Sequence, residues 1–175
     1  MRVEIRKLEK RDNRKDFCSG DIEIDRFFIK FAGQNQFKHK IGTTYVAIDI
    51  NSNNILGYAT ISVGSMNIEG LEVNEFKKFP NYPLPIVRVA RLGVDKHFQS
   101  QGIGRKLMQK MLYLAIEIEE LVGCIGIFVD AKEDAVSFYK KYGFEVVSVL
   151  NGELPIKPTQ TLMYLSIKTI RKILK

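Results

Sequence analysis

The sequence has few of the residues that build metal centres or disulfide frameworks. It contains two cysteines, two histidines and no tryptophan. Cys18 and Cys124 stand far apart, and neither they nor His39 and His97 form the closely spaced pairs of structural zinc sites. We therefore expect a protein without a metal cofactor, in which both thiols are packed or idle.

Long apolar runs are also missing. No stretch approaches the roughly 20 apolar residues that span a bilayer. Residues 1–6 alternate between charged and apolar side chains, whereas a secretory leader would continue with an apolar run. We therefore expect a cytoplasmic protein that does not enter a membrane.

The length and composition are those of one globular domain. The chain has 175 residues, of which 45% are hydrophobic, enough to form a core. We expect a single domain over residues 1–175. There are 27 lysines and arginines against 20 acidic residues, a formal charge of +7. A positive field favours polyanionic partners, but it does not choose among nucleic acid, a phosphate-bearing cofactor and an acidic protein.

The spacing of apolar residues predicts the first strand and the first helix. Residues 3–8 alternate in the manner of a strand. Apolar residues then recur at helical spacing from Ile24 to Phe31, after a segment rich in helix-capping residues that ends at Asp21. This pattern predicts an amphipathic helix that continues to about Lys40.

The remaining elements complete an α/β pattern. We expect a β-hairpin, a proline-containing loop with one short helix, and then strand, helix, strand, helix and two closing strands. The ranges are 43–50 and 55–66, 67–85, 86–94, 102–120, 124–129, 133–141, 144–150 and 162–167. This order predicts an α/β (α+β) fold, a mixed central sheet with helices on both faces.

One segment has the composition of a phosphate-binding loop. A strand that ends at Val94 feeds a short polar loop, which leads directly into the long helix. A helix N-terminus carries unpaired N–H groups and a partial positive charge, so it attracts phosphate. Gly102 and Gly104 have no Cβ and allow a diphosphate to approach the backbone. The segment is neither a Walker A loop nor a dinucleotide fingerprint, because Leu107 stands where a third glycine would be.

Two motifs resemble those of the GNAT N-acetyltransferase family. The string Gln-Ser-Gln-Gly-Ile-Gly at 99–104 resembles the family's acetyl-CoA loop, written Gln/Arg-x-x-Gly-x-Gly/Ala. The string from Ala135 to Phe144 resembles the second signature, Ala-x-x-Phe-Tyr-x-x-x-Gly-Phe. The resemblance implies the GNAT acyl-CoA N-acyltransferase fold, acetyl-CoA as co-substrate and direct transfer of an acetyl group to an amine.

The resemblance also implies roles for particular residues. The backbone of Leu92, Gly93 and Val94 would bind the pantetheine arm as an added strand would. Tyr139 would donate a proton to the leaving thiolate. Backbone groups of the loop would hold the pyrophosphate, with further cofactor contacts from the second motif region, and these residues are Gln99, Ser100, Gln101, Gly102, Ile103, Gly104, Arg105, Asp130 and Phe138.

The general base is left open by the sequence. Glu69, Glu72 and Glu75 lie in the expected substrate-facing loop, but glutamates in a polar loop usually serve solvation. An α-amino group, with a pKa of roughly 7.7–8.0, would depend less on a dedicated base.

A narrower resemblance is to the bacterial toxin branch of the family. It implies acetylation of the α-amino group of aminoacyl-tRNA, a ribbon-helix-helix antitoxin and a homodimer. Ser19 and Gly93 depart from the branch, where cysteine and alanine are more usual. The segments that carry the resemblance are 17–20, 25–28, 32–36, 57–62, 83–85 and 89–95.

Basic residues could form a phosphate-binding face for tRNA, although most surface lysines are simply solvated. The candidates are Lys38, Lys40, Lys77, Lys78, Arg88 and Arg91. Arg88 and Arg91 are three positions apart on one strand and would point to opposite faces. Two alternatives stay open: a small-molecule or protein N-acetyltransferase with the same cofactor site, and a catalytically silent module that binds CoA or RNA.

Overall fold

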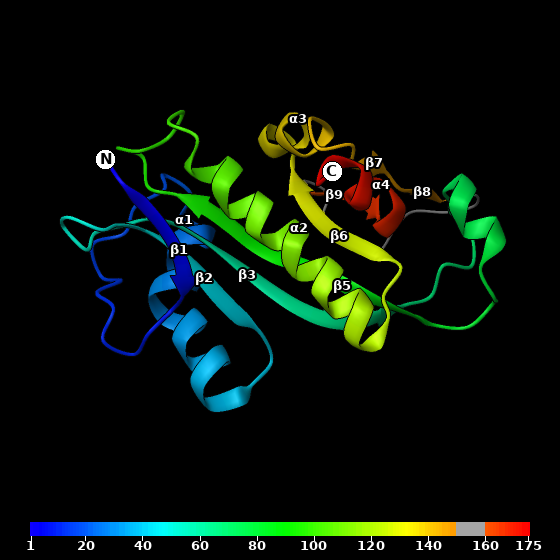
Figure 1. The fold of residues 1–175 in the computed structure, drawn as a ribbon, viewed down its shortest axis with the longest axis horizontal. Helices are drawn as coiled ribbons and strands as arrows, with labels where there is room; N and C mark the ends of the chain where they lie inside the picture. The colour runs from blue at the N-terminus through cyan, green and yellow to red at the C-terminus, as the bar shows by residue number, and fades with distance from the viewer. Residues whose placement is uncertain (150–159) are drawn as a thin grey trace. The chain divides into compact units, whose positions relative to one another are not determined.

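Seven strands follow one another in the sheet of the computed structural model, which describes residues 1–149 and 160–175 (Figure 1). The sheet is mixed, since β5 and β6 are parallel and the other recorded pairs are antiparallel. In spatial order the strands are β1 (Val3–Lys7), β2 (Thr43–Asp49), β3 (Ile55–Met66), β5 (Leu84–Val94), β6 (Gly126–Lys132), β9 (Gln160–Ser166) and β7 (Glu145–Val146). The mixed sheet and its helices confirm the predicted α/β class.

The chain divides into two compact units. The first comprises residues 1–62 and 89–113, and the second comprises residues 63–88 and 114–175. Among the described residues, no helix is both long and apolar enough to cross a membrane. Leu150, Pro155 and Pro158, which the sequence assigned to the last strands and their connection, lie outside the described residues.

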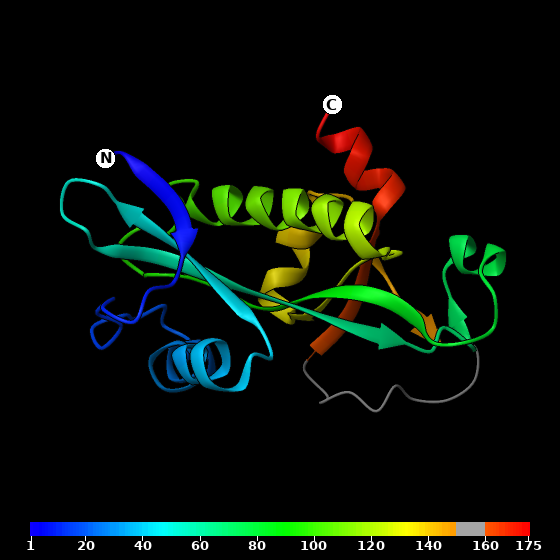
Figure 2. The ribbon, with the colours of Figure 1, turned by 60° about the horizontal axis from the view of Figure 1, so that its bottom comes forward.

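In the first unit, the strands of the hairpin present alternate side chains to two helical layers. Gly57 faces the start of α2 (Ile103–Val122), because a Cβ added there would lie 3.1 Å from both Ile103 and Leu107. Its neighbour Tyr58 faces the N-terminal helical segment and stacks on Phe28, with ring centroids 4.2 Å apart. Successive strand residues point to opposite faces, and Figure 2 shows the blue helical segment and the start of α2 on opposite sides of these strands.

The N-terminal helical segment has the predicted extent but not the predicted period. It consists of α1 (Ile22–Arg26), the π-helical η1 (Phe27–Ala32) and η2 (Asn35–His39), and it ends where Lys40 turns left-handed. Because π-helical bonds join residues five apart, the wider turn shifts the buried face. Ala32 is therefore buried, whereas Phe31, which the α-helical spacing assigned to the apolar face, is 39% exposed.

The second unit packs around an aromatic cluster. Phe128 on β6 and Tyr164 on β9 lie 4.9 Å apart between ring centroids, and Phe76 contacts both rings. Phe76 belongs to η3 (Asn74–Lys78), the short helix expected in the proline-containing loop. The second unit also holds β4 (Leu71–Glu72), η4 (Glu133–Ala135), α3 (Val136–Lys140), β8 (Ser148–Val149) and α4 (Ile167–Ile173).

Two expectations about this unit were wrong in detail, and one helix was missed. The strand expected over residues 144–150 is interrupted at Val147, and its two parts pair in different sheets. The strand expected from Cys124 begins two residues later, at Gly126. The helix α4 was not foreseen, although Ser166 caps it by accepting from the amide of Thr169.

Gly93 occupies a position with no room for a side chain. A Cβ there would lie 2.4 Å from Cγ2 of Ile24 and 3.1 Å from the ring of Tyr58. Ile24 and the rings of Tyr58 and Phe17 fill the volume that a methyl group would occupy, which explains why glycine stands here.

We predict that Gly93→Ala lowers the melting temperature, because overpacking a filled core costs about 1–3 kcal/mol. Gly64→Ala is the matched control in a strand, since its Cβ would meet only Ile86, at 3.9 Å. Adding Ile24→Ala to Gly93→Ala should recover part of the loss in thermal unfolding. Equal melting temperatures for the two single variants would contradict this account of Gly93.

Candidate functional site

The loop before α2 has the backbone geometry of an anion-binding concavity. Ser100 and Gly102 are left-handed, with φ of 61° and 81°, and both are exposed. Alternation of left-handed and right-handed residues turns successive N–H groups toward one point, which forms an anion nest. The first helical bond runs from the amide of Lys106 to the carbonyl of Gly102, so the amides of the preceding turn lack an intrahelical acceptor. These features fit the predicted pyrophosphate loop.

Asp95 fixes the beginning of this loop. The carboxylate is nearly buried and accepts from the backbone amides of His97, at 3.0 Å, and Cys18, at 3.2 Å. It also bonds Nδ1 of His97 at 2.9 Å. Burial alone would raise the pKa of Asp95, but these donors outweigh it and hold the pKa below its ordinary value. The sequence did not reveal this role, because Cys18 is distant in the chain.

Further bonds join the loop to the N-terminal segment. The amide of Lys96 donates to the carbonyl of Cys18 at 2.8 Å. The side-chain amide of Gln99 donates to the carbonyls of Ser19, at 2.8 Å, and Val94, at 3.1 Å. The side chain of Gln99 therefore has a structural role here, which leaves its backbone for the ligand contact that the sequence predicts.

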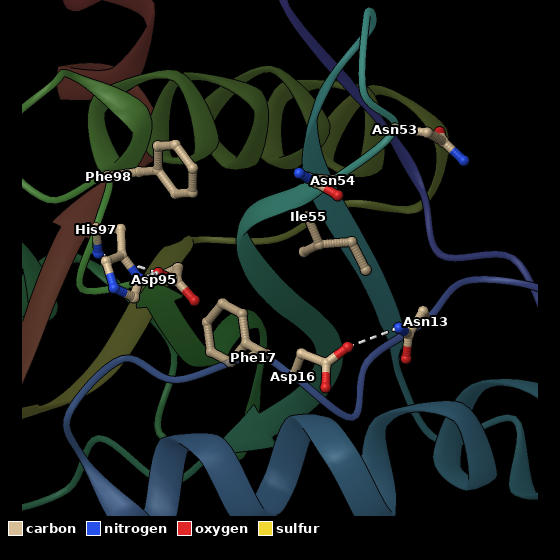
Figure 3. Close-up of a pocket in the computed structure, with 9 residues that line it drawn as sticks. All are labelled: Asn13, Asp16, Phe17, Asn53, Asn54, Ile55, Asp95, His97 and Phe98. Carbon is tan, nitrogen blue, oxygen red and sulfur yellow. Dashed lines mark hydrogen bonds and ion pairs between the residues drawn. The ribbon is translucent and has the colours of Figure 1, made fainter.

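A cavity of about 240 Å³ lies beside this anchor (Figure 3). Figure 3 shows the imidazole of His97 against Asp95 on one side, and Asn13 bonded to Asp16 on the other. The nine lining residues are Asn13, Asp16, Phe17, Asn53, Asn54, Ile55, Asp95, His97 and Phe98.

The two arginines of β5 have different surroundings. In the second unit, Arg88 forms an ion pair with Asp130, which the sequence named as a cofactor contact. In the first unit, the guanidinium of Arg91 lies over the ring of Phe27, 5.3 Å from its centroid. The charge of Arg88 is therefore already paired with a carboxylate, whereas Arg91 is exposed and its guanidinium lies over an aromatic ring.

Tyr139 lies in the second unit, on α3, between two phenylalanines. Its ring meets Phe138 and Phe144 edge-on, with centroids 5.3 and 5.4 Å away. The side chain is buried, and burial raises the pKa of Tyr139 to about 12. The phenol is therefore protonated throughout the physiological pH range, which suits a proton donor and not a base.

Of the three loop glutamates in the second unit, Glu75 differs from the other two in its burial. Glu69 and Glu72 are exposed, whereas Glu75 is half-buried and accepts from the hydroxyl of Tyr164 at 3.4 Å. Burial and the charge of Glu75 together raise the pKa of Glu145. No local sequence pattern marks this carboxylate pair, because Glu145 follows Glu75 by seventy residues.

Cys124 is not a ready nucleophile. Cys18 and Cys124 are free and half-buried, and burial raises the pKa of Cys124 to about 11. Within residues 1–149 and 160–175, no three His, Cys, Asp or Glu side chains gather as a metal site would require.

A comparison of the chain with known protein families identifies the family to which it belongs. The model of the acetyltransferase (GNAT) domain matches residues 40–146. The chain belongs to the GNAT acetyltransferase family. The matched range includes both the loop at residues 99–104 and Tyr139.

Among curated relatives, this GNAT chain is similar to a tRNA-acetylating toxin of Mycobacterium tuberculosis. The two are 25% identical over 142 residues, which is 81% of this chain and 83% of the toxin. It is also similar to a probable spermine N(1)-acetyltransferase of Bacillus subtilis, 31% identical over 67 residues, 37% of this chain and 40% of that enzyme.

Solved structures confirm the GNAT fold over almost the whole chain. A tyrosine-to-phenylalanine mutant of KacT superposes with a TM-score of 0.85 at 22% identity, covering 99% of both chains. AtaT complexed with acetyl-methionyl-tRNAfMet gives 0.82 at 23% identity, covering 99% of this chain and 100% of that one. AtaTR bound with AcCoA gives 0.79 at 23% identity, covering 99% and 98%.

We predict that Gly102→Val weakens acetyl-CoA binding about tenfold or more, since a charged ligand then loses at least one backbone hydrogen bond. Gly123→Val is the matched control. Gly123 also has a positive φ, 83°, and, as at Gly102, an added Cβ would meet nothing within 4 Å. Titration calorimetry should show the loss only at Gly102, and equal affinities in the two variants would remove the loop from the cofactor site.

Proposed function

We propose that residues 1–175 form a single N-acetyltransferase domain that transfers the acetyl group of acetyl-CoA to the α-amino group of aminoacyl-tRNA. The observation that carries the proposal is the similarity to the tRNA-acetylating toxin, which extends over 81% of this chain. The net charge of +7 is compatible with an RNA substrate.

In this proposal the loop binds the pyrophosphate of acetyl-CoA. Support comes from the two left-handed residues and from the first turn of α2, whose amides lack intrahelical acceptors. Leu92, Gly93 and Val94 offer backbone groups to the pantetheine arm. Further contacts are proposed for the residues Gln99, Ser100, Gln101, Gly102, Ile103, Gly104, Arg105, Asp130 and Phe138.

The chemistry needs one proton removed and one supplied. The neutral amine attacks the acetyl carbonyl carbon, the C–S bond breaks with its electron pair on sulfur, and the phenol of Tyr139 gives its proton to the thiolate. The raised pKa of Tyr139 keeps that proton in place before the reaction. The amine proton leaves to water or to a carboxylate, and an α-amino group with a pKa of roughly 7.7–8.0 is already about half neutral or more at pH 8.

The second candidate function is acetylation of a small polyamine. The similarity to the probable spermine N(1)-acetyltransferase favours it, and the carboxylate pair of Glu75 and Glu145 would suit a cationic amine. That similarity covers 37% of the chain, however, and the tRNA-acetylating relative covers more than twice as much. A silent binding module is less well supported, because the phosphate loop and Tyr139 are both present.

The proposal extends to location and assembly. A tRNA-acetylating toxin works in the cytoplasm, where its substrate is, and we propose the same location for this chain. We further propose a homodimer and a ribbon-helix-helix antitoxin as partner. Both follow from the toxin-branch resemblance. The antitoxin is supported by the likeness, at 21% identity, to an AtaT mutant bound to the C-terminus of the antitoxin AtaR.

Thiol release from acetyl-CoA tests the proposed substrate directly. The purified chain is compared with charged total tRNA, the same tRNA after deacylation, and a panel of polyamines. Release with charged tRNA alone is the expected result, because only that sample presents the aminoacyl α-amino group. Release with a polyamine and not with charged tRNA would favour the second candidate.

We predict that Tyr139→Phe lowers kcat by about 100-fold or more, within the range typical of a lost general acid. Acetyl-CoA affinity should be unchanged, because phenylalanine keeps the edge-on packing against Phe138 and Phe144. Tyr142→Phe, which also contacts Phe138, is the matched control and should retain turnover. Unaltered kcat in the Tyr139 variant would exclude its role as proton donor.

A further inference from the structure

Two guanidinium–ring pairs lie at the junction of α1 and η1 in the first unit. Phe31 is 39% exposed, and the guanidinium of Arg26 lies over its ring, 5.8 Å from the centroid. One residue from Arg26, the half-buried ring of Phe27 carries the guanidinium of Arg91 at 5.3 Å. The exposed Lys30 adjoins Phe31 in sequence. We call these five residues the η1 face.

The π-helix creates this arrangement. An α-helix places residues three and four apart side by side, whereas π-helical bonding joins residues five apart. Arg26 and Phe31 are five apart, so the transition from α1 to η1 brings the guanidinium above the ring. π-helical turns are rare and often found at functional sites, and here the turn exposes a large apolar ring among cations.

The chemistry of the η1 face matches one class of ligand. An exposed ring gives a stacking platform for an unpaired base, and stacked guanidinium groups and a lysine attract phosphate. A purely apolar partner would leave three cations desolvated without partners. Asp25, the acid next to Arg26 in sequence, is engaged by the amide and hydroxyl of Ser19, at 2.7 and 2.6 Å.

We propose that the η1 face binds the unpaired 3′ end of the RNA substrate, with a base stacked on Phe31 and phosphates near Arg26, Lys30 and Arg91. The proposal rests on the proposed function for the identity of the RNA. On β5, the phosphate contact is assigned to Arg91. Arg88 is not chosen, because it already forms an ion pair with Asp130. The bonds from Lys96 and Gln99 to residues 18 and 19 connect the phosphate loop to the segment that carries this face.

The test is fluorescence anisotropy of the full chain with two labelled RNA hairpins, one blunt and one with four unpaired 3′ nucleotides. Phe31→Ala should weaken binding of the overhang hairpin about tenfold, the scale of one lost base stack, and leave the blunt hairpin unchanged. Tyr113→Ala, which removes an exposed ring from α2 (46% exposed), is the control and should match wild type. Arg26→Gln should weaken both hairpins and lower the salt dependence by about one phosphate contact.

Unchanged overhang affinity in both Phe31→Ala and Arg26→Gln would overturn the proposal. A shift from dimer to monomer in Phe31→Ala, with RNA affinity unchanged, would assign the η1 face to a protein contact and overturn it as well. The binding readout needs no turnover. Loss of overhang binding in Phe31→Ala would therefore support the η1 face even if charged tRNA proved not to be acetylated.

Discussion

The hydrogen bonds of Asp95 connect three segments of the first unit. This carboxylate collects the amides of Cys18 and His97 and the imidazole of His97, and its own amide donates to the carbonyl of Leu56. Through these bonds one residue joins the N-terminal segment, the strand β3 and the start of the phosphate loop. The backbone donors keep the pKa of Asp95 low, so the anchor stays charged at neutral pH.

Close packing of β3 and β5 is the second constraint on this unit. A Cβ on Gly57 would lie 2.9 Å from the carbonyl oxygen of Gly93, and a Cβ on Gly93 would strike Ile24. The two glycines let the strands, α2 and the N-terminal helical segment approach closely. Substitution at either position would disturb the end of β5, which leads into the loop.

The sequence predicted the elements that depend on local chain geometry. A strand, a polar loop with two glycines and a long helix were expected at the proposed phosphate loop, and the second motif located the helix that carries Tyr139. The family followed from these strings and was confirmed. The roles of the individual residues remain predictions, to be tested by the variants described above.

Other features depend on contacts between distant residues or on unusual helical geometry. Two of these contacts join positions far apart in the chain, so no local pattern marks them. They are the ion pair of Arg88 with Asp130 and the hydrogen bond from Gln99 to the carbonyl of Ser19. Periodicity analysis assumes the α-helical repeat and therefore misplaced Phe31, because η1 has a wider turn. The helix α4 has only seven residues, too few for a strong periodic signal.

The position of the transferred acetyl group tests the account most directly. The chain is incubated with labelled acetyl-CoA and charged tRNA, the RNA is digested with nuclease, and the terminal aminoacyl-nucleoside is analysed by mass spectrometry. The account predicts one acetyl group, on the α-amino nitrogen of the amino acid. Label on a nucleobase, on the protein itself or on added polyamine, with none on the amino acid, would contradict it.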